Sequence, residues 1–405
     1  MLFLQNEEIV EIWVEGDDNP IRIGGVALVT ARTAGGASVA ELPDGSGYLR
    51  DGKVNDGARV VVQVTADGSG AKRAVLRRRV ELAGDGVVLT PFQPELGIAS
   101  AIKAKGRRAA IRAAVQPALA DGLGAMIRSE AAERDVEDLA AEVSRLVDLW
   151  HAIERAAQTA APPCWLLPPP DLPTRVAAHR PGIAIEHDRD GTAFRDAGGE
   201  EALDRALAGT VALADGLSLV VEEGETATLV DVNLARSPRG EALVQANLQA
   251  AAGAAAIARL RGLRGTLLID FPRMGGRGDR DRVAEALRGA VADDPAAWQV
   301  LGWTPGGMLE CLRESPRRSL SDELLVPPGD RRLSPRARAW AALDRLRREV
   351  GGIARPRLRV PPEVAGWLEG PGAIIVAAER RRLGALTVTA DPALGPQDCA
   401  IDGDG

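Results

Sequence analysis

The chain has 405 residues, of which 45% are hydrophobic and 26% charged, and its net charge at pH 7 is −7. This length predicts several domains of about 100 to 200 residues each, and the composition excludes wholesale disorder. No apolar run reaches the roughly 20 residues of a membrane span, and residues 1–10 lack the pattern of a secretion signal. The sequence therefore predicts a folded, cytoplasmic protein without a membrane span.

The acidic balance excludes a surface coated in positive charge, which is the usual electrostatic footprint of nucleic-acid binding. Basic residues nevertheless gather locally, in residues 77–79 and 103–108. The three cysteines, Cys164, Cys311 and Cys399, form no CxxC pair. Their spacing fits a reducing compartment and supplies no zinc site.

Short β segments separated by glycine-rich turns are predicted in the first part of the chain. About five short strands suit a small OB-type barrel, a fold that binds single-stranded nucleic acid on an aromatic side chain. Tyr48, the only tyrosine, follows one of these turns. Its ring is expected either to stack on a base or to lie half-buried in the barrel. The predicted strands are residues 26–30, 37–42, 59–65 and 75–82.

Helical periodicity follows Pro91 and predicts helices over residues 109–120 and 136–159. Between them, residues 122–130 are typical of a turn followed by a short buried strand that ends in polar residues. Arg128 and Ser129 at the end of this strand are suited to donate hydrogen bonds to a phosphate. The alternative for Arg128 is a surface salt bridge.

The region from residue 217 to residue 310 alternates between strand and helix patterns. Asp231 and Asp270 each stand near the C-terminal end of an otherwise apolar strand. The tail predicts a basic helix over residues 335–350, then strand, helix and strand, with a frayed end from residue 399. The predicted strands of the central region are residues 217–222, 227–232, 266–271 and 298–303, and its helices are residues 241–260 and 280–291.

Two aspartates on separate strands point to a metal site. An ionised carboxylate in an apolar strand is costly unless it is paired or metal-bound. Mg²⁺ takes one or two carboxylates together with waters and substrate phosphate oxygens, and Asn233 lies close to Asp231 in the sequence. The structural alternative is that Asp231 or Asp270 caps a helix or pairs with an arginine. The three histidines have no zinc spacing, and no GxSxG or Walker A motif occurs.

Residues 225–233, ETATLVDVN, resemble the catalytic strand of the ribonuclease E/G family. The resemblance continues through Arg236, Arg239 and Gly240 in an RxxRG pattern, an alanine-rich helix, and residues 266–274, which are similar to the family's second metal-binding strand. Upstream, Met126-Ile127-Arg128-Ser129 resembles a strand that senses a 5′ monophosphate. Gly47-Tyr48-Leu49 lies where the family's OB barrel carries an aromatic residue. The resemblance covers about residues 20–320.

The resemblance implies a multidomain α+β and α/β fold. In this interpretation an OB-fold RNA-binding barrel, residues 21–90, is inserted in an RNase H-like unit. That unit, with the 5′-sensor region, comprises residues 1–20 and 91–215. A DNase I-like catalytic subdomain, residues 216–320, follows, and a small C-terminal α/β module, residues 330–405, ends the chain.

The resemblance also implies the activity and the roles of the site residues. Asp231 and Asp270 would coordinate Mg²⁺, with Mn²⁺ as the alternative ion, and Asn233 would orient the attacking water or an aspartate. Single-stranded, A/U-rich RNA would be cut internally, in RNA or rRNA processing or decay, to leave 3′-hydroxyl and 5′-phosphate ends. The expected RNA contacts are Tyr48 with a base, Arg128 and Ser129 with a 5′ phosphate, and Arg236 and Arg239.

Three departures from the family pattern keep other interpretations open. Val326 and Gly329 stand where the family carries the cysteines of a CPxC element, so zinc is not expected, and a homo-oligomer would not form through a zinc link. Glu314-Ser315-Pro316 replaces part of a basic run, and residues 164–216 match poorly. The alternatives to an endoribonuclease are a catalytically weak or inactive RNA-binding protein of the same architecture and a scaffold with no RNA role.

Overall fold

The computed structural model describes residues 1–5, 7–15, 22–68, 73–119, 122–179, 184–188, 192–315, 317–326 and 331–404. It confirms a mixed α+β protein of several domains. The chain forms two compact units, one of residues Pro20–Glu186 and one that joins Met1–Asn19 to His187–Gly405. The second unit therefore contains both ends of the chain.

A closed five-stranded barrel forms in the unit Pro20–Glu186, as predicted for an OB-type fold. The strands pair in the order β3, β4, β5, β7 and β6, and β6 pairs back onto β3. Alternate residues such as Val29, Val62 and Leu76 point inward and are fully buried. The strands are β3 (Val26–Ala34), β4 (Ala37–Leu42), β5 (Gly45–Leu49), β6 (Arg59–Ala66) and β7 (Ala74–Arg77).

The strand predicted over residues 75–82 is wrong at its C-terminal end. It stops at Arg77, and residues 78–81 leave the barrel before the short strand β8 (Leu82–Ala83) begins. Arg78 turns away because its backbone N–H donates to the Asp51 carboxylate at 2.7 Å instead of to a neighbouring strand. Three consecutive arginines are thereby placed at the rim of the barrel.

The same unit has a second hydrophobic core under two helices. The sheet order is β10, β11, β9 and β8, and the helix over residues 136–159 forms as predicted. Its apolar residues recur at helical spacing, so Leu139, Val143 and Trp150 face this core. The further elements of the unit are β9 (Val87–Thr90), β10 (Leu96–Ile98), α1 (Lys105–Val115), η1 (Gln116–Ala118), β11 (Gly124–Ile127), η2 (Ser129–Ala131), α2 (Val136–Thr159), β12 (Cys164–Leu167) and α3 (Leu172–His179).

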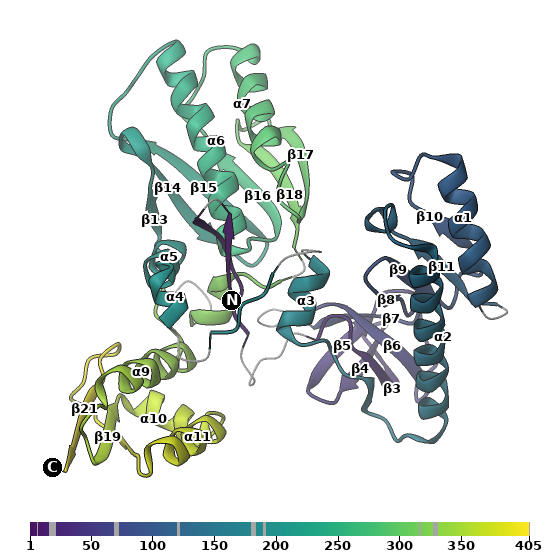
Figure 1. Ribbon diagram of the computed structural model, residues 1–405. Helices are drawn as coiled ribbons and strands as arrows, with labels where there is room; N and C mark the ends of the chain where they lie inside the picture. The colour runs from purple at the N-terminus through teal and green to yellow at the C-terminus, as the bar shows by residue number, and fades with distance from the viewer. Residues whose placement is uncertain are drawn as a thin grey trace. The chain divides into compact units, whose positions relative to one another are not determined.

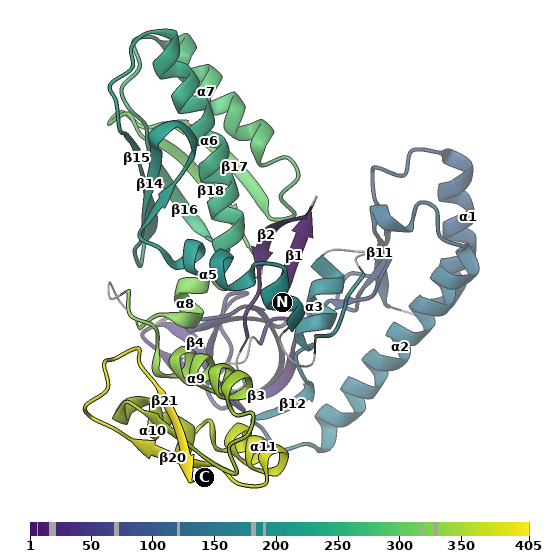
Figure 2. The same cartoon turned by 60° about the vertical axis from the view of Figure 1, so that its left-hand side comes forward.

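A six-stranded sheet dominates the other unit, with order β13, β14, β15, β16, β18 and β17. Its parallel pair is β15 and β16, which are connected through α6 because parallel neighbours need a crossover. Helices α6 and α7 lie on the same face of the sheet (Figures 1 and 2). The elements are β13 (Thr210–Ala212), β14 (Leu217–Glu223), β15 (Ala227–Leu234), α6 (Glu241–Arg261), β16 (Gly265–Asp270), α7 (Arg277–Ala290), β17 (Ala297–Trp303) and β18 (Leu309–Glu314).

The two faces of this sheet differ in burial. On the covered face, Val230 and Ile269 pack with small residues of α6 such as Ala254, which let the helix approach closely. Residues on the other face are exposed or half-buried, and Leu229 is 41% exposed. Polar side chains on this face therefore remain accessible to solvent.

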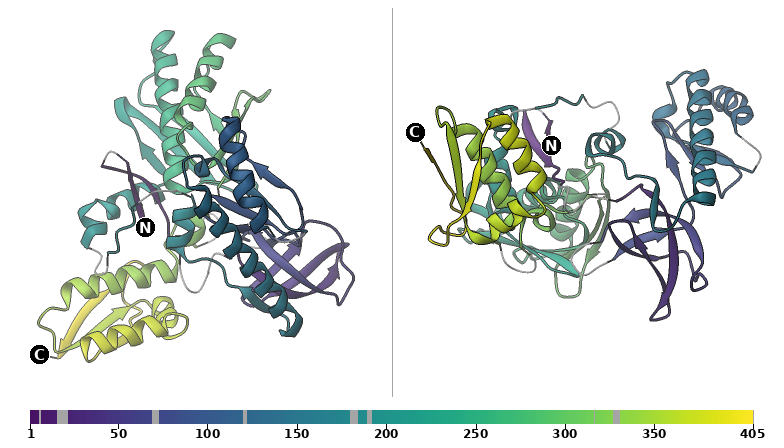
Figure 3. Two further views of the ribbon diagram at one scale, coloured as in Figure 1. Left: turned by 45° about the vertical axis from the view of Figure 1, so that its right-hand side comes forward. Right: turned by 90° about the horizontal axis from the view of Figure 1, so that it is seen from below.

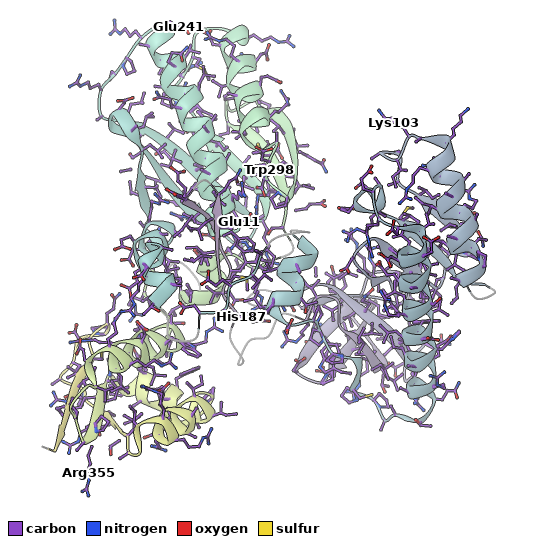
Figure 4. All side chains as sticks on the ribbon, viewed as in Figure 1. Glu11, Lys103, His187, Glu241, Trp298 and Arg355 are labelled. Carbon is purple, nitrogen blue, oxygen red and sulfur yellow. The ribbon has the colours of Figure 1, made fainter. Side chains whose placement is uncertain are left out.

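The N-terminal hairpin, β1 (Leu2–Gln5) and β2 (Glu8–Ile12), packs against α6. Ile12 joins the core of the six-stranded sheet. Glu11, labelled in Figure 4, pairs with Arg259 of α6 at 3.0 Å. The shorter helices of this unit are α4 (Thr192–Asp196), α5 (Gly199–Leu207), η3 (Ala214–Gly216) and α8 (Leu320–Leu324).

The C-terminal module has its own core and a three-stranded sheet of order β20, β19 and β21. The predicted frayed end is wrong, because β21 pairs antiparallel with β19 and ends close to the C-terminus (Figure 3). Ile401 packs against the module's core and so favours the pairing. The elements are α9 (Pro335–Glu349), β19 (Arg355–Val360), α10 (Pro362–Glu369), α11 (Ala373–Leu383), β20 (Thr387–Ala390) and β21 (Ala400–Asp404).

Within the described part of the chain, no helix is both long enough and apolar enough to cross a membrane. The three cysteines are free thiols. Cys311 is fully buried in the core of the six-stranded sheet, and this burial raises the pKa of its thiol to about 12.

Candidate functional site

Asp231 and Asp270 lie directly opposite each other in the parallel pair β15 and β16. Their neighbours Val230 and Ile269 point into the helix-covered core, so both aspartates point to the other face, and both are exposed. Adjacent strands are about 4.8 Å apart, which puts the carboxylates side by side. The expectation that these carboxylates pay a burial cost is wrong, because strand alternation turns them towards solvent.

This carboxylate pair has no protein counter-ion among the described residues. Among the described residues, no lysine, arginine or histidine nitrogen lies within ion-pair distance of either aspartate. Neither aspartate caps a neighbouring helix, because the N-cap residues of α6 and α7 are Gly240 and Gly276. In the described part of the chain, therefore, neither aspartate caps a helix or pairs with an arginine. Like charges directly opposite each other destabilise a sheet, so a bound cation would relieve this repulsion.

Asn233 extends the same exposed row of β15. Its side-chain amide nitrogen, Nδ2, donates to Asp231 Oδ2 at 2.8 Å. The hydrogen bond occupies one oxygen of the carboxylate and restrains its rotation. Asn233 is therefore placed to orient an aspartate, one of the two roles expected for it.

The donor set fits Mg²⁺ better than zinc. No group of three or more histidine, cysteine, aspartate or glutamate side chains suited to hold a metal occurs in the described residues. A structural zinc site needs four such ligands. Mg²⁺ uses one or two carboxylates and fills its remaining positions with water and phosphate oxygens, which is what Asp231 and Asp270 can offer.

Asn247 holds the chain segment that follows Asp270, a role that was not recognised from the sequence. It is fully buried on α6, and its Nδ2 donates to the Pro272 carbonyl at 2.9 Å. Pro272 follows Asp270 by two residues, so this bond fixes the segment that leaves the second aspartate. The sequence feature that could have identified Asn247 is its position as a polar residue on the apolar face of an alanine-rich helix.

Arg236 and Arg239 lie in the connection between β15 and α6, and both are exposed. Neither has a carboxylate partner among the described residues, so their guanidinium groups are accessible to phosphates. The nearby Glu241 begins α6 (Figure 4) and accepts hydrogen bonds of 2.9 and 2.7 Å from Arg282 of α7. These bonds lower the pKa of Glu241 to about 2 and tie the two helices together at this end.

Arg128 and Ser129 follow β11, but a carboxylate accompanies them. The Ser129 hydroxyl donates to Glu130 Oε2 at 3.1 Å. A backbone hydrogen bond, the Ser129 hydroxyl and the charge of Arg128 lower the pKa of Glu130 below its usual value. A phosphate bound here would therefore meet an ionised glutamate. The described residues provide no salt-bridge partner within 4 Å of Arg128, so the expected surface ion pair is not seen.

Tyr48 lies on the outer face of the barrel and is 38% exposed. On the neighbouring strands it stands opposite Val39 and Val75. Arg50 and Arg77 lie on the same face and are exposed. An aromatic ring flanked by arginines is the usual surface for single-stranded nucleic acid.

The two arginines that flank residues 314–316, Arg313 and Arg317, are buried in the protein interior. Arg313 is 2% exposed and makes two hydrogen bonds, of 2.9 and 3.1 Å, to the Asp294 carboxylate. Arg317 is 3% exposed, and burial lowers its pKa to about 9. Neither side chain is accessible to RNA. Of the two positions that replace zinc cysteines, Val326 donates its N–H to the Arg332 carbonyl at 2.9 Å, whereas Gly329 lies outside the described residues.

Together, the fold and the candidate site define a multidomain α+β protein with a closed, OB-like barrel and a pair of exposed aspartates on adjacent strands. A model of the Ribonuclease E/G family matches residues 81–182 and 176–315, which together span more than half of the chain. The chain belongs to the ribonuclease E/G family.

Individual relatives agree with this assignment. Ribonuclease E of Haemophilus influenzae is 29% identical over 316 residues, which cover 68% of this chain and 34% of the relative. Ribonuclease E of Escherichia coli is 27% identical over 305 residues, 66% of this chain and 29% of the relative. Ribonuclease G of Haemophilus influenzae is 26% identical over 305 residues, 67% of this chain and 62% of the relative. The chain thus spans less than two thirds of the length of each of these relatives.

Proposed function

We propose that this protein is a Mg²⁺-dependent endoribonuclease that cuts single-stranded RNA. The observation that carries the proposal is the pair of exposed carboxylates, Asp231 and Asp270, which face each other on adjacent strands without a counter-ion among the described residues. Membership of the ribonuclease E/G family and the names of its relatives support RNA as the substrate. In the family's terms, the six-stranded sheet is the DNase I-like subdomain, and residues 1–20 and 91–215 form the RNase H-like and 5′-sensor region.

The proposed mechanism assigns each side chain a task. Asp231 and Asp270 would hold the ion, and Asn233 restrains the orientation of Asp231 through its hydrogen bond. When bound, Mg²⁺ stabilises charge on the phosphate and makes a water a better nucleophile. Hydrolysis of the phosphodiester would break the bond between phosphorus and the 3′ oxygen, so the products would carry 3′-hydroxyl and 5′-phosphate ends. Arg236 and Arg239 hold phosphates of the substrate.

The remaining parts of the proposal concern substrate choice and setting. Tyr48 stacks on a base, which favours unpaired and therefore A/U-rich segments. Glu130 beside Ser129 and Arg128 weakens recognition of a 5′ phosphate, because an ionised carboxylate repels it. The protein acts in the cytoplasm, where its free thiols stay reduced. Any homo-oligomer forms without a zinc link.

The test is cleavage of a fluorescent, 5′-monophosphorylated A/U-rich RNA oligomer, with and without Mg²⁺. Asp231→Asn and Asp270→Asn should each reduce the cleavage rate by roughly 100-fold or more, because each removes a charged ligand of the ion. Asp293→Asn is the matched control, since Asp293 is exposed, lies in the same unit and has no ion-pair partner among the described residues. It should cut at the wild-type rate.

The other outcomes identify the alternatives. Tight RNA binding without cleavage by the wild-type protein would make it an RNA-binding relative without catalysis, an interpretation that the net charge of −7 and the replaced cysteines favour. A protein that neither binds nor cuts RNA would be a scaffold.

A further inference from the structure

A groove of about 910 Å³ runs along the outside of the barrel within the unit Pro20–Glu186. Its floor is the outward face of β6, where alternate residues such as Val61 and Thr65 turn away from the barrel core. Its sides come from the rim of β7 and from the turn after β9, which carries Phe92. The aspartate pair belongs to the other unit.

The groove concentrates positive charge on an acidic protein. Five arginines and two carboxylates line it, although the net charge of the chain is −7. Two of the arginines have partners: the Arg78 guanidinium pairs with the Asp51 carboxylate at 3.7 Å, and Arg59 donates to the Ala157 and Ala160 carbonyls at 3.1 and 2.8 Å.

The other three arginines of the groove are exposed and available. In the described part of the chain, no carboxylate lies within ion-pair distance of any of them. Phosphates of a bound ligand could pair with these three guanidinium groups. These three residues are Arg50, Arg77 and Arg79.

Phe92 adds an aromatic surface to the groove. It is 51% exposed, and its ring meets Trp150 edge-on, with 5.6 Å between the ring centroids and 77° between the planes. Trp150 is buried, at 5% exposure, so it fixes the orientation of Phe92 while part of the Phe92 ring remains open. Exposed aromatic rings held in this way serve as stacking platforms for bases.

The groove continues the face that carries Tyr48. Strands β5, β7 and β6 are neighbours in that order (Figure 1). Arg50 follows Tyr48 by two residues, its backbone N–H donates to the Leu76 carbonyl of β7, and Arg77 is the next residue of that strand. The outer surface thus passes from an aromatic ring through arginines to the groove with a second aromatic ring.

We propose that this groove, defined by Arg50, Arg77, Arg79 and Phe92, binds a second segment of the single-stranded RNA that crosses Tyr48. The three arginines bind phosphates, and Phe92 stacks on a base. This inference rests on the proposed function for the identity of the ligand as RNA. An acidic protein segment would satisfy the arginines but would bring no bases to stack on Phe92.

The test measures binding without cleavage. The anisotropy of a fluorescent A/U-rich RNA is titrated with full-length protein in EDTA, from 50 to 200 mM salt. The double variant Arg77→Ala with Arg79→Ala should lower the slope of log affinity against log salt by about 1.4, because each lost phosphate contact removes about 0.7. Phe92→Leu should weaken binding by roughly 5- to 100-fold, and Phe92→Tyr should not, because only tyrosine keeps an aromatic face.

The control removes the same charge elsewhere in the same unit. Arg145 and Arg155 lie exposed on α2 and have no ion-pair partner among the described residues. Alanine at both positions should leave affinity and salt slope at their wild-type values. Thermal melts of all variants, followed by circular dichroism, check that the fold is kept, and the double variant of Arg77 and Arg79 tests the groove if Phe92→Leu melts early.

Three results would overturn the proposal that the groove binds RNA. They are an unchanged salt slope in the Arg77 and Arg79 variant, an equal loss of RNA affinity in the Arg145 and Arg155 control, and equal displacement of the RNA by poly-glutamate and by unlabelled RNA. The last result would assign the groove to an acidic protein segment. These outcomes are independent of cleavage. A wild-type protein that binds RNA through the groove but never cuts it would contradict the proposed function alone.

Discussion

Two asparagines stabilise the aspartate pair from different sides. Asn233 lies on the exposed face of β15 and bonds to Asp231 itself. Asn247 is buried on α6 and holds the chain just after Asp270. One residue type can serve both positions because its amide nitrogen donates hydrogen bonds without carrying a charge. Burying a charged side chain at residue 247 would be far more costly.

Asn233→Ala should impair the site by loosening Asp231. Without the hydrogen bond from Nδ2 the Asp231 carboxylate rotates more freely, so the Mg²⁺ concentration for half-maximal cleavage should rise about tenfold, the lower end of the usual effect of residues that orient metal ligands. The measurement is a Mg²⁺ titration of cleavage. At saturating Mg²⁺ the variant should recover much of its rate. An unchanged titration midpoint would show that Asn233 does not position Asp231.

At the scale of elements, one buried ion pair connects the segment before β17 to strand β18 of the six-stranded sheet. Asp294, in the segment between α7 and β17, forms an ion pair with Arg313 of β18 and accepts a hydrogen bond of 2.7 Å from the Trp298 indole. Burial alone would raise the pKa of Asp294, but the hydrogen bonds and charge of Arg313 outweigh it and hold the pKa below its usual value. The carboxylate is therefore ionised in the folded protein at neutral pH.

Asp294→Asn should destabilise the protein by about 3–5 kcal/mol at pH 7, because it leaves Arg313 buried without its partner. The folded-state pKa of Asp294 is below the unfolded value near 3.8, so the stabilisation is fully present above that value and is lost as the pH falls through the folded pKa. Urea unfolding at pH 7 and at pH 3 measures both effects. The difference between variant and wild type should shrink at the lower pH, and a difference independent of pH would contradict this account.

Elements with strong periodicity were predicted from the sequence, and elements that depend on a distant partner were not. The helix over residues 136–159 and the strand and helix pattern around Asp231 and Asp270 formed as predicted, because local spacing decides them. Strand β5 was not among the predicted strands, since its glycine-rich sequence resembles a turn until β4 and β7 pair with it. Strand β21 was missed for the same reason, because its partner β19 lies about 40 residues earlier.

At the scale of the whole molecule, the proposed base-stacking surfaces and the proposed catalytic residues belong to different units. Tyr48 and the arginine groove belong to the unit Pro20–Glu186, whereas Asp231, Asp270 and Asn233 belong to the unit that contains both chain ends. Each unit has its own hydrophobic core. Binding and cleavage should therefore be separable.

A fragment of residues 20–186 should fold and bind RNA but should not cut it. Its barrel and its helix-covered sheet bury their own cores, and it lacks both aspartates. Circular dichroism and urea unfolding check that the fragment is cooperatively folded, and anisotropy and gel assays measure binding and cleavage. Cleavage by the fragment would place the chemistry outside the aspartate pair. A folded fragment that binds no RNA would show that the barrel needs the other unit.

The sequence by itself was sufficient for the family and for an OB-type barrel, and it singled out Asp231, Asp270 and Asn233 as the candidate site, because short motifs and strand or helix periods are local properties of the chain. Only the tertiary structure decided that the two aspartates stand opposite each other on the open face of a sheet, that the N-terminal hairpin packs against α6, and that Phe92 and the arginines after β7 share one groove. Such neighbours are set by strand register and by the packing of segments far apart in the chain, which no local pattern encodes.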